Sequence, residues 1–466
     1  METWLIIISS LCIPAILKAV FNLLYPSRRP THNLPPSPFT FPIIESLSWL
    51  PKTFADLEPI LRDLHPKFGP MVGIGPHPAI FISDRFLIHQ ALVQNGAVLA
   101  DRPPALIACR IINSNQRTID TTVYGLTWRV LRRNLTAEIL NHSRVKSYSH
   151  GRKLVLQILK EKLSVKAGEA VLVVNYLRYA MCCLLVLKCF GDKLDESQMK
   201  KIKVAQHCVL LNVEVFNEIN FWPKVTKILF CKKWKYIFQI HKNQEDLLIP
   251  LIKARKKVKK ENLSKEKEDK KIEDKEEHIV SYVDTLLDLK LHEEKRKLDE
   301  VEMVSLCSEF LNVGTDTTST ALHWITAVIL EGQRGQPLAH FVLPHRVTED
   351  VVLNNFLVPR KGTVNFYIAE MGWDPKVWED PMAFRPDRFL NSDGGEEVFD
   401  LTGRKEIKMI PFGAGRRICP AYGLAMLHLE YFVANLVLSF EWKAVDGDDI
   451  DLSEKQEFTM VMKNPL

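Results

Sequence analysis

The chain has 466 residues, which exceeds the usual size of a single domain and allows a large buried core. Apolar residues make up 46% of it and charged residues 25%, and the formal charge of +6 is modest, so the composition does not suggest a nucleic-acid-binding protein. The nine cysteines are an odd number without paired spacing, which fits reduced thiols in a cytosol-facing protein better than a disulfide framework.

The N-terminal stretch is apolar enough to cross a membrane. Residues 4–25 are mostly apolar, and a helix of that length spans about 33 Å, enough for a hydrocarbon core of about 30 Å. Arg28 and Arg29 follow, so the positive-inside tendency leaves the bulk of the protein in the cytosol. A cleaved signal peptide is the alternative, but no basic region precedes the run and no convincing cleavage site ends it. We expect a membrane anchor over residues 1–27 and a basic, proline-rich linker over residues 28–40.

A hairpin and a long helical region follow the linker. Two short alternating runs, Pro70 to Gly75 and Ala79 to Ser83, are separated by turn residues and predict a β-hairpin. From Thr127 onward helical periodicity dominates. Trp128 and Arg132 lie four residues apart and therefore share a helix face. Such a pair is either packed at the surface or, because a guanidinium matches a carboxylate, binds an anionic group.

A charge run with few apolar residues extends from Lys253 to Glu277. Most such runs are solvated linkers or exposed helix faces. Docking of an acidic electron donor or of anionic lipid head groups is the alternative, because Lys and Arg predominate at its start. The sequence leaves both open.

A long apolar helix pattern begins near Val301 and contains an unusual polar stretch, Phe310 to Thr320. Glycine, aspartate and several threonines are poor choices for a helix interior, and such local disagreement is expected where function overrides stability. A threonine hydroxyl there can bond a carbonyl one turn back or a ligand beside Gly314, and the neighbouring carboxylate can exchange protons with water. The alternative is a threonine-rich buried helix.

Two further charged motifs follow. Glu331 and Arg334 lie three residues apart, and Arg388 belongs to the run Phe384 to Phe389. Alone, each motif would be a surface ion pair worth under about 1 kcal/mol. Between them lies His345, which on its own would be an ordinary hydrogen-bonded histidine.

Near the C-terminus, the stretch Pro411 to Gly423 leads into an apolar run from Leu424 to Phe440. Its glycines allow a tight turn that something flat can approach closely. Cys419 stands where a helix begins, and unpaired N–H groups and the helix dipole stabilise a thiolate at that place. A buried structural cysteine is the alternative.

Taken together, these motifs and their order resemble the cytochrome P-450 superfamily, and the segment from Trp373 to Phe389 is especially similar to plant microsomal members. The resemblance implies a mainly α fold with small β-sheets (α+β) and a haem-thiolate catalytic domain over residues 41–466. It also implies roles for the site residues: Cys419 as the iron ligand within the turn that Phe412 opens, Asp316 and Thr317 as proton donors during oxygen activation, Trp128, Arg132, His345 and Arg417 as propionate contacts, and Glu331, Arg334 and Arg388 as a cluster supporting the cysteine turn.

The chain departs from the family pattern between two motifs. Thr317 and Glu331 are only fourteen positions apart, about 21 Å along a continuous helix, whereas the family places two further helices there. We therefore expect an internally shortened chain, with two helices missing near residues 325–331. If the fused helix is straight, Glu331 would not reach Arg388, and a broken buried charge cluster costs about 3–5 kcal/mol. Smaller departures are Val313 and Ala421, which stand where relatives usually have smaller residues.

The resemblance implies a monooxygenase that contains haem b and inserts one oxygen atom from O2 into a hydrophobic small molecule of the secondary-metabolite class. Electrons would come from NADPH through a separate reductase, and the protein would sit in the endoplasmic reticulum membrane, single-pass, with its catalytic domain in the cytosol. Three alternatives remain: a non-catalytic remnant or splice product unable to hold haem, a haem-thiolate isomerase, and a binding or scaffold protein that only retains the fold.

Overall fold

The computed structural model describes residues 33–38, 54–74, 79–212, 216, 219–220, 223–268, 280–291, 294–324, 329–389, 399–443 and 453–464. The described chain is mainly helical with small β-sheets, which confirms the predicted fold class. The predicted membrane anchor lies outside these residues. Two compact units divide the chain, one formed by residues 1–101 and 343–367 and the other by residues 102–342 and 368–466.

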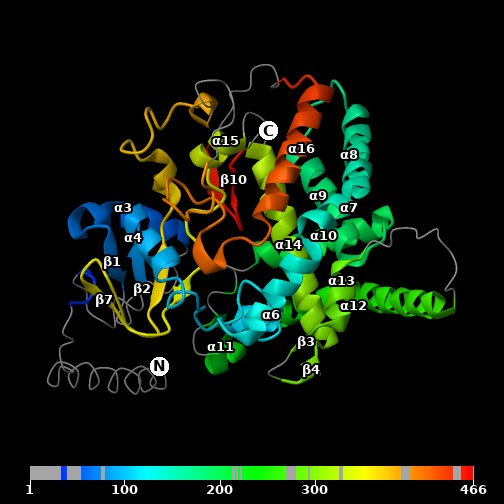
Figure 1. Cartoon of the computed structure of the whole chain (residues 1–466), viewed down its shortest axis with the longest axis horizontal. Helices are drawn as coiled ribbons and strands as arrows, with labels where there is room; N and C mark the ends of the chain where they lie inside the picture. Colours follow the sequence, from blue (N-terminus) through cyan, green and yellow to red (C-terminus); the bar gives the residue numbers. More distant parts are fainter. Residues whose placement is uncertain are drawn as a thin grey trace, which may run out of the picture. The chain divides into compact units, whose positions relative to one another are not determined.

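The first unit contains a four-stranded sheet in the order β1-β2-β8-β5 (Figure 1). Strands β1 (Met71–Ile74) and β2 (Ala79–Ile82) pair antiparallel, which confirms the predicted hairpin. Strand β2 pairs parallel with β8 (Thr363–Phe366), which pairs antiparallel with β5 (His345–Arg346). The remaining elements of this unit are α3 (Phe54–Phe68), α4 (Arg85–His89), the π-turn η1 (Gln90–Gln94) and the hairpin of β6 (Val351–Leu353) with β7 (Phe356–Val358).

The described part of the proline-rich segment pairs with this sheet region. The carbonyl of Pro36 accepts a hydrogen bond from the Gly73 N–H at 2.9 Å. The carbonyl of Asn33 accepts one from the Leu357 N–H at 2.8 Å, next to a parallel bridge with Phe356. Residues 33–38 are therefore attached to the first unit and do not behave as a free spacer.

The second unit is built from helices. In chain order these are α5 (Ile107–Ile112), α6 (Leu126–Asn134), the π-turn η2 (Leu135–Ile139), α7 (His142–Ser147), α8 (Ser149–Ser164), α9 (Val173–Phe190), α10 (Glu196–Leu211), α11 (Pro223–Leu229), α12 (Cys231–Glu268), α13 (Tyr282–Asp288), α14 (Glu300–Trp324), α15 (Ile329–Gly335) and α16 (Tyr422–Ser439). Short 3-10 turns η4 (Ala369–Trp373), η5 (Pro386–Phe389) and η6 (Gly415–Arg417) precede α16, and two small hairpins pair β3 (Lys290–Leu291) with β4 (Arg296–Lys297) and β9 (Glu454–Gln456) with β10 (Met460–Met462).

Helix α14 is the central element of the second unit. It packs along α9 and also contacts α10, α12 and α16, as Figure 1 shows. Apolar side chains of α9, α12, α13 and α14, with Leu131 of α6, form one buried cluster, and a second cluster joins α8, α9 and α16. Close packing of these apolar side chains holds α14 in place. It therefore also sets the positions of the polar residues in the middle of this helix.

Part of the predicted charge run lies in α12. The helix ends at Glu268, so the first half of the run is helical, and residues 269–279 lie outside the described chain. Several of its lysines form ion pairs: Lys253 with Glu300 at 3.2 Å and Lys259 with Asp288 at 2.5 Å. This half of the run is a helix face that joins neighbouring helices.

Among the described residues, two helices are long and apolar enough to span a membrane, α9 and α16. Helix α9 contributes ten buried residues to the second unit, so its hydropathy reflects core packing, whereas α16 buries one face in the second cluster.

Candidate functional site

Cys419 lies in a tight turn that precedes α16. Gly413 and Gly415 adopt φ angles of 69° and 68°, a left-handed backbone that glycine adopts without steric cost. The Cys419 N–H donates to the carbonyl of Phe412 at 2.8 Å and closes the turn. Ala421 has φ −100°, which any residue adopts, so the extra methyl group at this position causes no backbone strain.

The surroundings of Cys419 act on its thiol in opposite directions. Burial raises the pKa of the Cys419 thiol, while the Ala421 N–H and the positive charge of Arg132 lower it. Burial has the larger effect, so the pKa of Cys419 lies above its ordinary value. The protein alone therefore favours the thiol. Because a coordinating metal ion deprotonates a cysteine, a cation at Cys419 would shift this balance to the thiolate.

The predicted propionate contacts of the second unit lie around the cysteine turn. The Arg132 guanidinium donates to the carbonyl of Ile418 at 2.5 Å. Arg417 lies with its Cζ 4.5 Å from the centre of the Trp128 ring, and Arg132 lies 5.8 Å from the same ring. The Trp128 indole N–H donates to the carbonyl of Ile119 at 3.1 Å. Arg132 thus bonds the residue before Cys419, and Trp128 lies against Arg417, while the propionate role of both stays a prediction.

The polar stretch of α14 divides between two sides of the helix. The Thr317 hydroxyl donates to the carbonyl of Val313, one turn back, at 2.6 Å, which is one of the two interactions expected for it. Val313 is 37% exposed, so this side of the helix is open. Gly314 serves helix packing, because a Cβ at this position would lie 2.7 Å from Cδ1 of Leu185 on α9. The expected ligand groove beside Gly314 is thus occupied by α9.

Asp316 is buried and paired. Its Oδ1 lies 3.2 Å from Nη2 of Arg178 on α9 and 4.0 Å from Nδ1 of His207 on α10, and its Oδ2 accepts from the Thr459 hydroxyl at 3.1 Å. Arg178, His207 and Thr459 therefore surround the Asp316 carboxylate, and a proton that moves between Asp316 and water has to pass them. Arg178 belongs to no sequence motif, although a charged residue within the apolar run Val173–Phe190 is a signal for a buried ion pair.

Glu331, Arg334 and Arg388 form the predicted cluster. The Arg334 guanidinium donates to both carboxylate oxygens of Glu331 at 2.7 Å, and Nε of Arg388 lies 3.3 Å from Glu331 Oε2. Arg334 also donates to the carbonyl of Gly372. Burial raises the pKa of Glu331, but hydrogen bonds from Arg334 and from the Arg385 N–H bring it below its usual value.

Glu331 meets Arg388 despite the short spacing between Thr317 and Glu331. Helix α14 ends at Trp324 and α15 begins at Ile329, and the two short elements α15 and η5 meet at the buried Glu331 carboxylate. Residues 325–328 lie outside the described chain. The separation considered for a straight fused helix is therefore not found.

His345 belongs to the first unit. Its Nδ1 lies 2.5 Å from the carbonyl oxygen of Leu99, and its ring meets Phe366 edge-on with 5.3 Å between ring centres. Cys419 belongs to the second unit, so a propionate contact of His345 stays a prediction.

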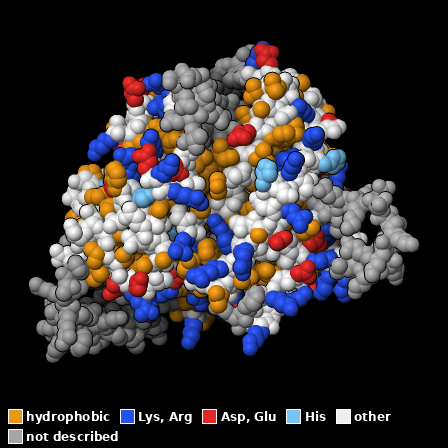
Figure 2. Space-filling view, in the orientation of Figure 1, with side chains coloured by type: hydrophobic (Ala, Val, Ile, Leu, Met, Phe, Trp, Pro, Cys, Tyr) orange, Lys and Arg blue, Asp and Glu red, His pale blue; other side chains and the backbone are white. Residues whose placement is uncertain are grey.

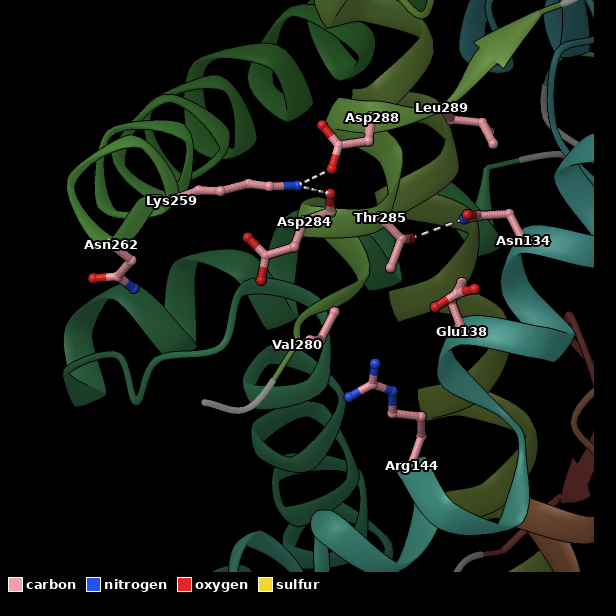
Figure 3. Close-up of a pocket in the computed structure, with 10 residues that line it drawn as sticks. All are labelled: Asn134, Glu138, Arg144, Lys259, Asn262, Val280, Asp284, Thr285, Asp288 and Leu289. Atoms are coloured by element: carbon pink, nitrogen blue, oxygen red, sulfur yellow. Dashed lines mark hydrogen bonds and ion pairs between the residues drawn. The ribbon is translucent and has the colours of Figure 1, made fainter. Parts of the chain in front are cut away.

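A cavity of about 450 Å³ opens between α6, η2, α7, α12 and α13 (Figure 3). Lys259 Nζ donates to Asp288 at 2.5 Å and to the carbonyl of Asp284 at 2.6 Å, and the Asn134 amide donates to Thr285 at 2.9 Å. None of the predicted site residues lines it, and its polar, charged wall does not suit an apolar substrate.

Comparison with known proteins decides the family. A sequence profile described as Cytochrome P450 matches residues 35–326 and 325–466. The chain belongs to the cytochrome P450 family.

Similar proteins come from plants. Cytochrome P450 89A9 of Arabidopsis thaliana is 44% identical over 518 aligned positions, which cover 99% of this chain and 97% of the relative. Isoflavone 2'-hydroxylase of Medicago truncatula is 26% identical, covering 99% of this chain and 97% of the relative. Among solved structures, a zebra fish cytochrome P450 with progesterone matches with a TM-score of 0.68 at 18% identity, over 87% of this chain and 97% of that one, which shows the fold.

The residues around Cys419 fit the haem-thiolate cofactor that the family implies. Cys419 supplies a sulfur ligand, and Arg132 and Arg417 supply guanidinium groups for carboxylates. A Cβ added at Gly413 or Gly423 would meet no atom within 4 Å, so open space borders the turn. The donor set and this open space suit a flat, dianionic ligand with a metal ion.

Proposed function

We propose that this chain binds haem b through the Cys419 sulfur and inserts one oxygen atom from O2 into a hydrophobic small molecule. The observation that carries the proposal is the cluster of Cys419, Arg132, Trp128 and Arg417 around one turn. When bound, the haem would supply the iron centre that activates dioxygen, with electrons delivered from NADPH by a separate reductase.

The residues of the chain would divide the work as follows. Arg132, Trp128 and Arg417 bind and orient the propionates, and His345 is proposed as a further contact. Thr317 holds a proton on a hydroxyl that can turn from the Val313 carbonyl toward the open side of α14. Asp316, held by Arg178, receives protons from the solvent side through His207, whose ring lies at 4.0 Å and is partly exposed.

The buried cluster of Glu331, Arg334 and Arg388 would hold the cysteine turn in place. Its hydrogen bonds are complete, with Glu331 0% exposed and accepting from Arg334 and from the Arg385 N–H. A remnant whose charge cluster is broken would not have this arrangement, so the geometry favours a competent scaffold.

The reductase would meet the basic surface around α6. Arg129 and Arg133 of α6 and Arg416 of the cysteine turn are exposed, and Figure 2 shows Lys and Arg side chains gathered over this part of the visible face. A positive surface next to the haem ligand attracts an acidic electron donor. The proposed anchor over residues 1–27 would hold both proteins at the endoplasmic reticulum membrane, with the catalytic part in the cytosol.

The substrate class is proposed from the relatives. Their names include an isoflavone 2'-hydroxylase, a germacrene A acid 8-beta-hydroxylase and a 5-epiaristolochene 1,3-dihydroxylase. This supports a secondary metabolite of that kind as substrate.

We also propose that the chain is internally shortened near residues 325–331. The family profile matches in two stretches that meet at residues 325–326, and the alignment with the Arabidopsis relative spans 518 positions against 466 residues here.

Absorption spectroscopy of the full chain in detergent tests the function. Reduction under carbon monoxide should give the shift typical of a thiolate ligand, and Cys419→Ala should abolish it while Cys208→Ala, on α10, keeps it. Absence of the shift in the unaltered chain would refute haem-thiolate chemistry. Oxygen-dependent NADPH consumption with a reductase then separates a monooxygenase from an isomerase.

A further inference from the structure

Glu309 on α14 binds a turn of the chain that no sequence motif marks. Its carboxylate oxygens accept two successive backbone N–H groups, Oε2 from Ile119 at 2.9 Å and Oε1 from Asp120 at 2.7 Å. One carboxylate with two adjacent N–H donors fixes both the position and the orientation of a turn, because the two oxygens are rigidly joined.

The same turn carries the groups that hold the cofactor-binding side chains. The carbonyl of Ile119 accepts from the Trp128 indole N–H at 3.1 Å and from Arg417 Nη1 at 3.1 Å. The carbonyl of Thr122 accepts from Arg417 Nη2 at 2.7 Å. A single residue, Ile119, thus connects Glu309 on its N–H side with Trp128 and Arg417 on its C=O side.

The turn has further internal bonds, and the Ile119 side chain also packs in the buried cluster that includes α14. Thr122 bonds the Thr118 carbonyl through both its N–H, at 2.9 Å, and its hydroxyl, at 2.5 Å. The Asp120 carbonyl accepts from Arg102 Nε at 2.7 Å. The turn is therefore a compact body, and Glu309 joins it through hydrogen bonds to the helix bearing Asp316 and Thr317.

We propose that Glu309 is a positioning residue for the haem site: by holding residues 118–122 it sets the place of Trp128 and Arg417, and so couples the oxygen-activation helix to the propionate contacts. The inference rests on the proposed function. Glu309 touches neither substrate nor haem in this role and acts only through the turn.

The electrostatics of Glu309 fit a group that is held in place. Burial and then the neighbouring Asp120 carboxylate raise the pKa of Glu309, while the N–H groups of Ile119 and Asp120 lower it, and the balance lies well above the usual value. The two backbone N–H groups are thus the contacts that favour the charged carboxylate at this buried position.

The test compares Glu309→Gln with Asp284→Asn in the full chain. Glutamine keeps the shape but offers one acceptor oxygen, so one of the two N–H groups loses its partner. Asp284 on α13 is also a buried carboxylate, held by Arg255 at 2.6 Å, and its side-chain hydrogen-bond partners among the described residues, Arg255 and Ser281, lie outside the turn. Its replacement controls for a general loss of stability.

Two measurements test this role of Glu309: hydrogen exchange of the turn and the rate of haem loss. Backbone hydrogen exchange of residues 117–124, measured by mass spectrometry on the chain as purified, should rise about tenfold in Glu309→Gln and stay unchanged in Asp284→Asn. Transfer of haem to apomyoglobin should be about tenfold faster in Glu309→Gln alone.

Unchanged hydrogen exchange in Glu309→Gln would overturn the proposal. Faster exchange with an unchanged rate of haem transfer would also overturn it, because Glu309 would then order the turn without affecting the cofactor. Equal effects of both substitutions would reduce Glu309 to a general stabilising residue. If the unaltered chain takes up no haem, the proposed function and the cofactor role fall together, whereas exchange still decides whether Glu309 orders the turn.

Discussion

Lys188 of α9 is a buried cation with no anion to neutralise it, and its replacement should stabilise the protein. The side chain is 0% exposed, and within the described part of the chain its Nζ has no hydrogen-bond partner. It lies 5.1 Å from the centre of the Tyr148 ring. Its charged neighbours, Arg152 of α8 and His428 of α16, are themselves basic.

Burial, and then the charge of Arg152, lower the pKa of Lys188 from 10.5 to about 7. In the unfolded chain the pKa is the ordinary one, so between these two pH values the unfolded state binds a proton that the folded state lacks. Stability therefore rises with pH across this interval. Each tenfold change in proton affinity corresponds to about 1.4 kcal/mol, which sets an upper limit of roughly 5 kcal/mol on the cost of charged Lys188.

We predict that Lys188→Met raises the free energy of unfolding by roughly 2–5 kcal/mol at about pH 7, and that this gain shrinks by roughly 3 kcal/mol at about pH 9.5, where the folded protein already holds neutral lysine. Urea unfolding of the full chain in detergent at both pH values measures it. Lys153→Met, on the exposed face of α8, should change little at either pH. A gain independent of pH, or a loss, would show that Lys188 is charged and paired in the folded protein, and the reasoning would be wrong.

Three further predictions concern the site. Glu331→Gln leaves the Arg334 and Arg388 charges without their shared carboxylate and should cost about 3–5 kcal/mol of unfolding free energy, measured by urea titration; a cost under about 1 kcal/mol would mean that the cluster is solvated. Thr317→Ala removes the proton-bearing hydroxyl, so more reduced oxygen should leave as hydrogen peroxide per NADPH, by about tenfold, and unchanged coupling would remove Thr317 from proton delivery. Arg133→Glu should slow reductase-supported haem reduction about tenfold at low salt and less at high salt, whereas Lys146→Glu on α7 should not; equal effects of the two would place the docking surface elsewhere.

The sequence predicted those parts of the site whose residues are neighbours along the chain. Trp128 and Arg132 share a helix face by spacing alone, and the tight turn before α16 followed from its glycines. The polar stretch of α14 stood out because it contradicts helix propensity. Each of these signals is local, and local signals are readable without the fold.

The rest depends on contacts between distant segments. Glu309 and Ile119 are 190 positions apart, and Asp316 meets Thr459 across 143 positions. A glutamate on an amphipathic helix has no sequence feature that separates a backbone-binding carboxylate from an exposed one. The meeting of Glu331 with Arg388 likewise depends on how α15 and η5 are placed and not on distance along the chain, so the spacing of the motifs alone left it open.

Gly372 has a consequence for how variants of this chain should be interpreted. A side chain at this position would overlap the carbonyl oxygen of Arg334, and the Gly372 carbonyl itself accepts from the Arg334 guanidinium. Even Gly372→Ala would push the 3-10 turn η4 off α15 and tilt the arginine away from its carboxylate. Such an allele would keep every recognisable motif, so a scan of motifs would classify it as intact, whereas a measured free energy of unfolding would reveal the loss.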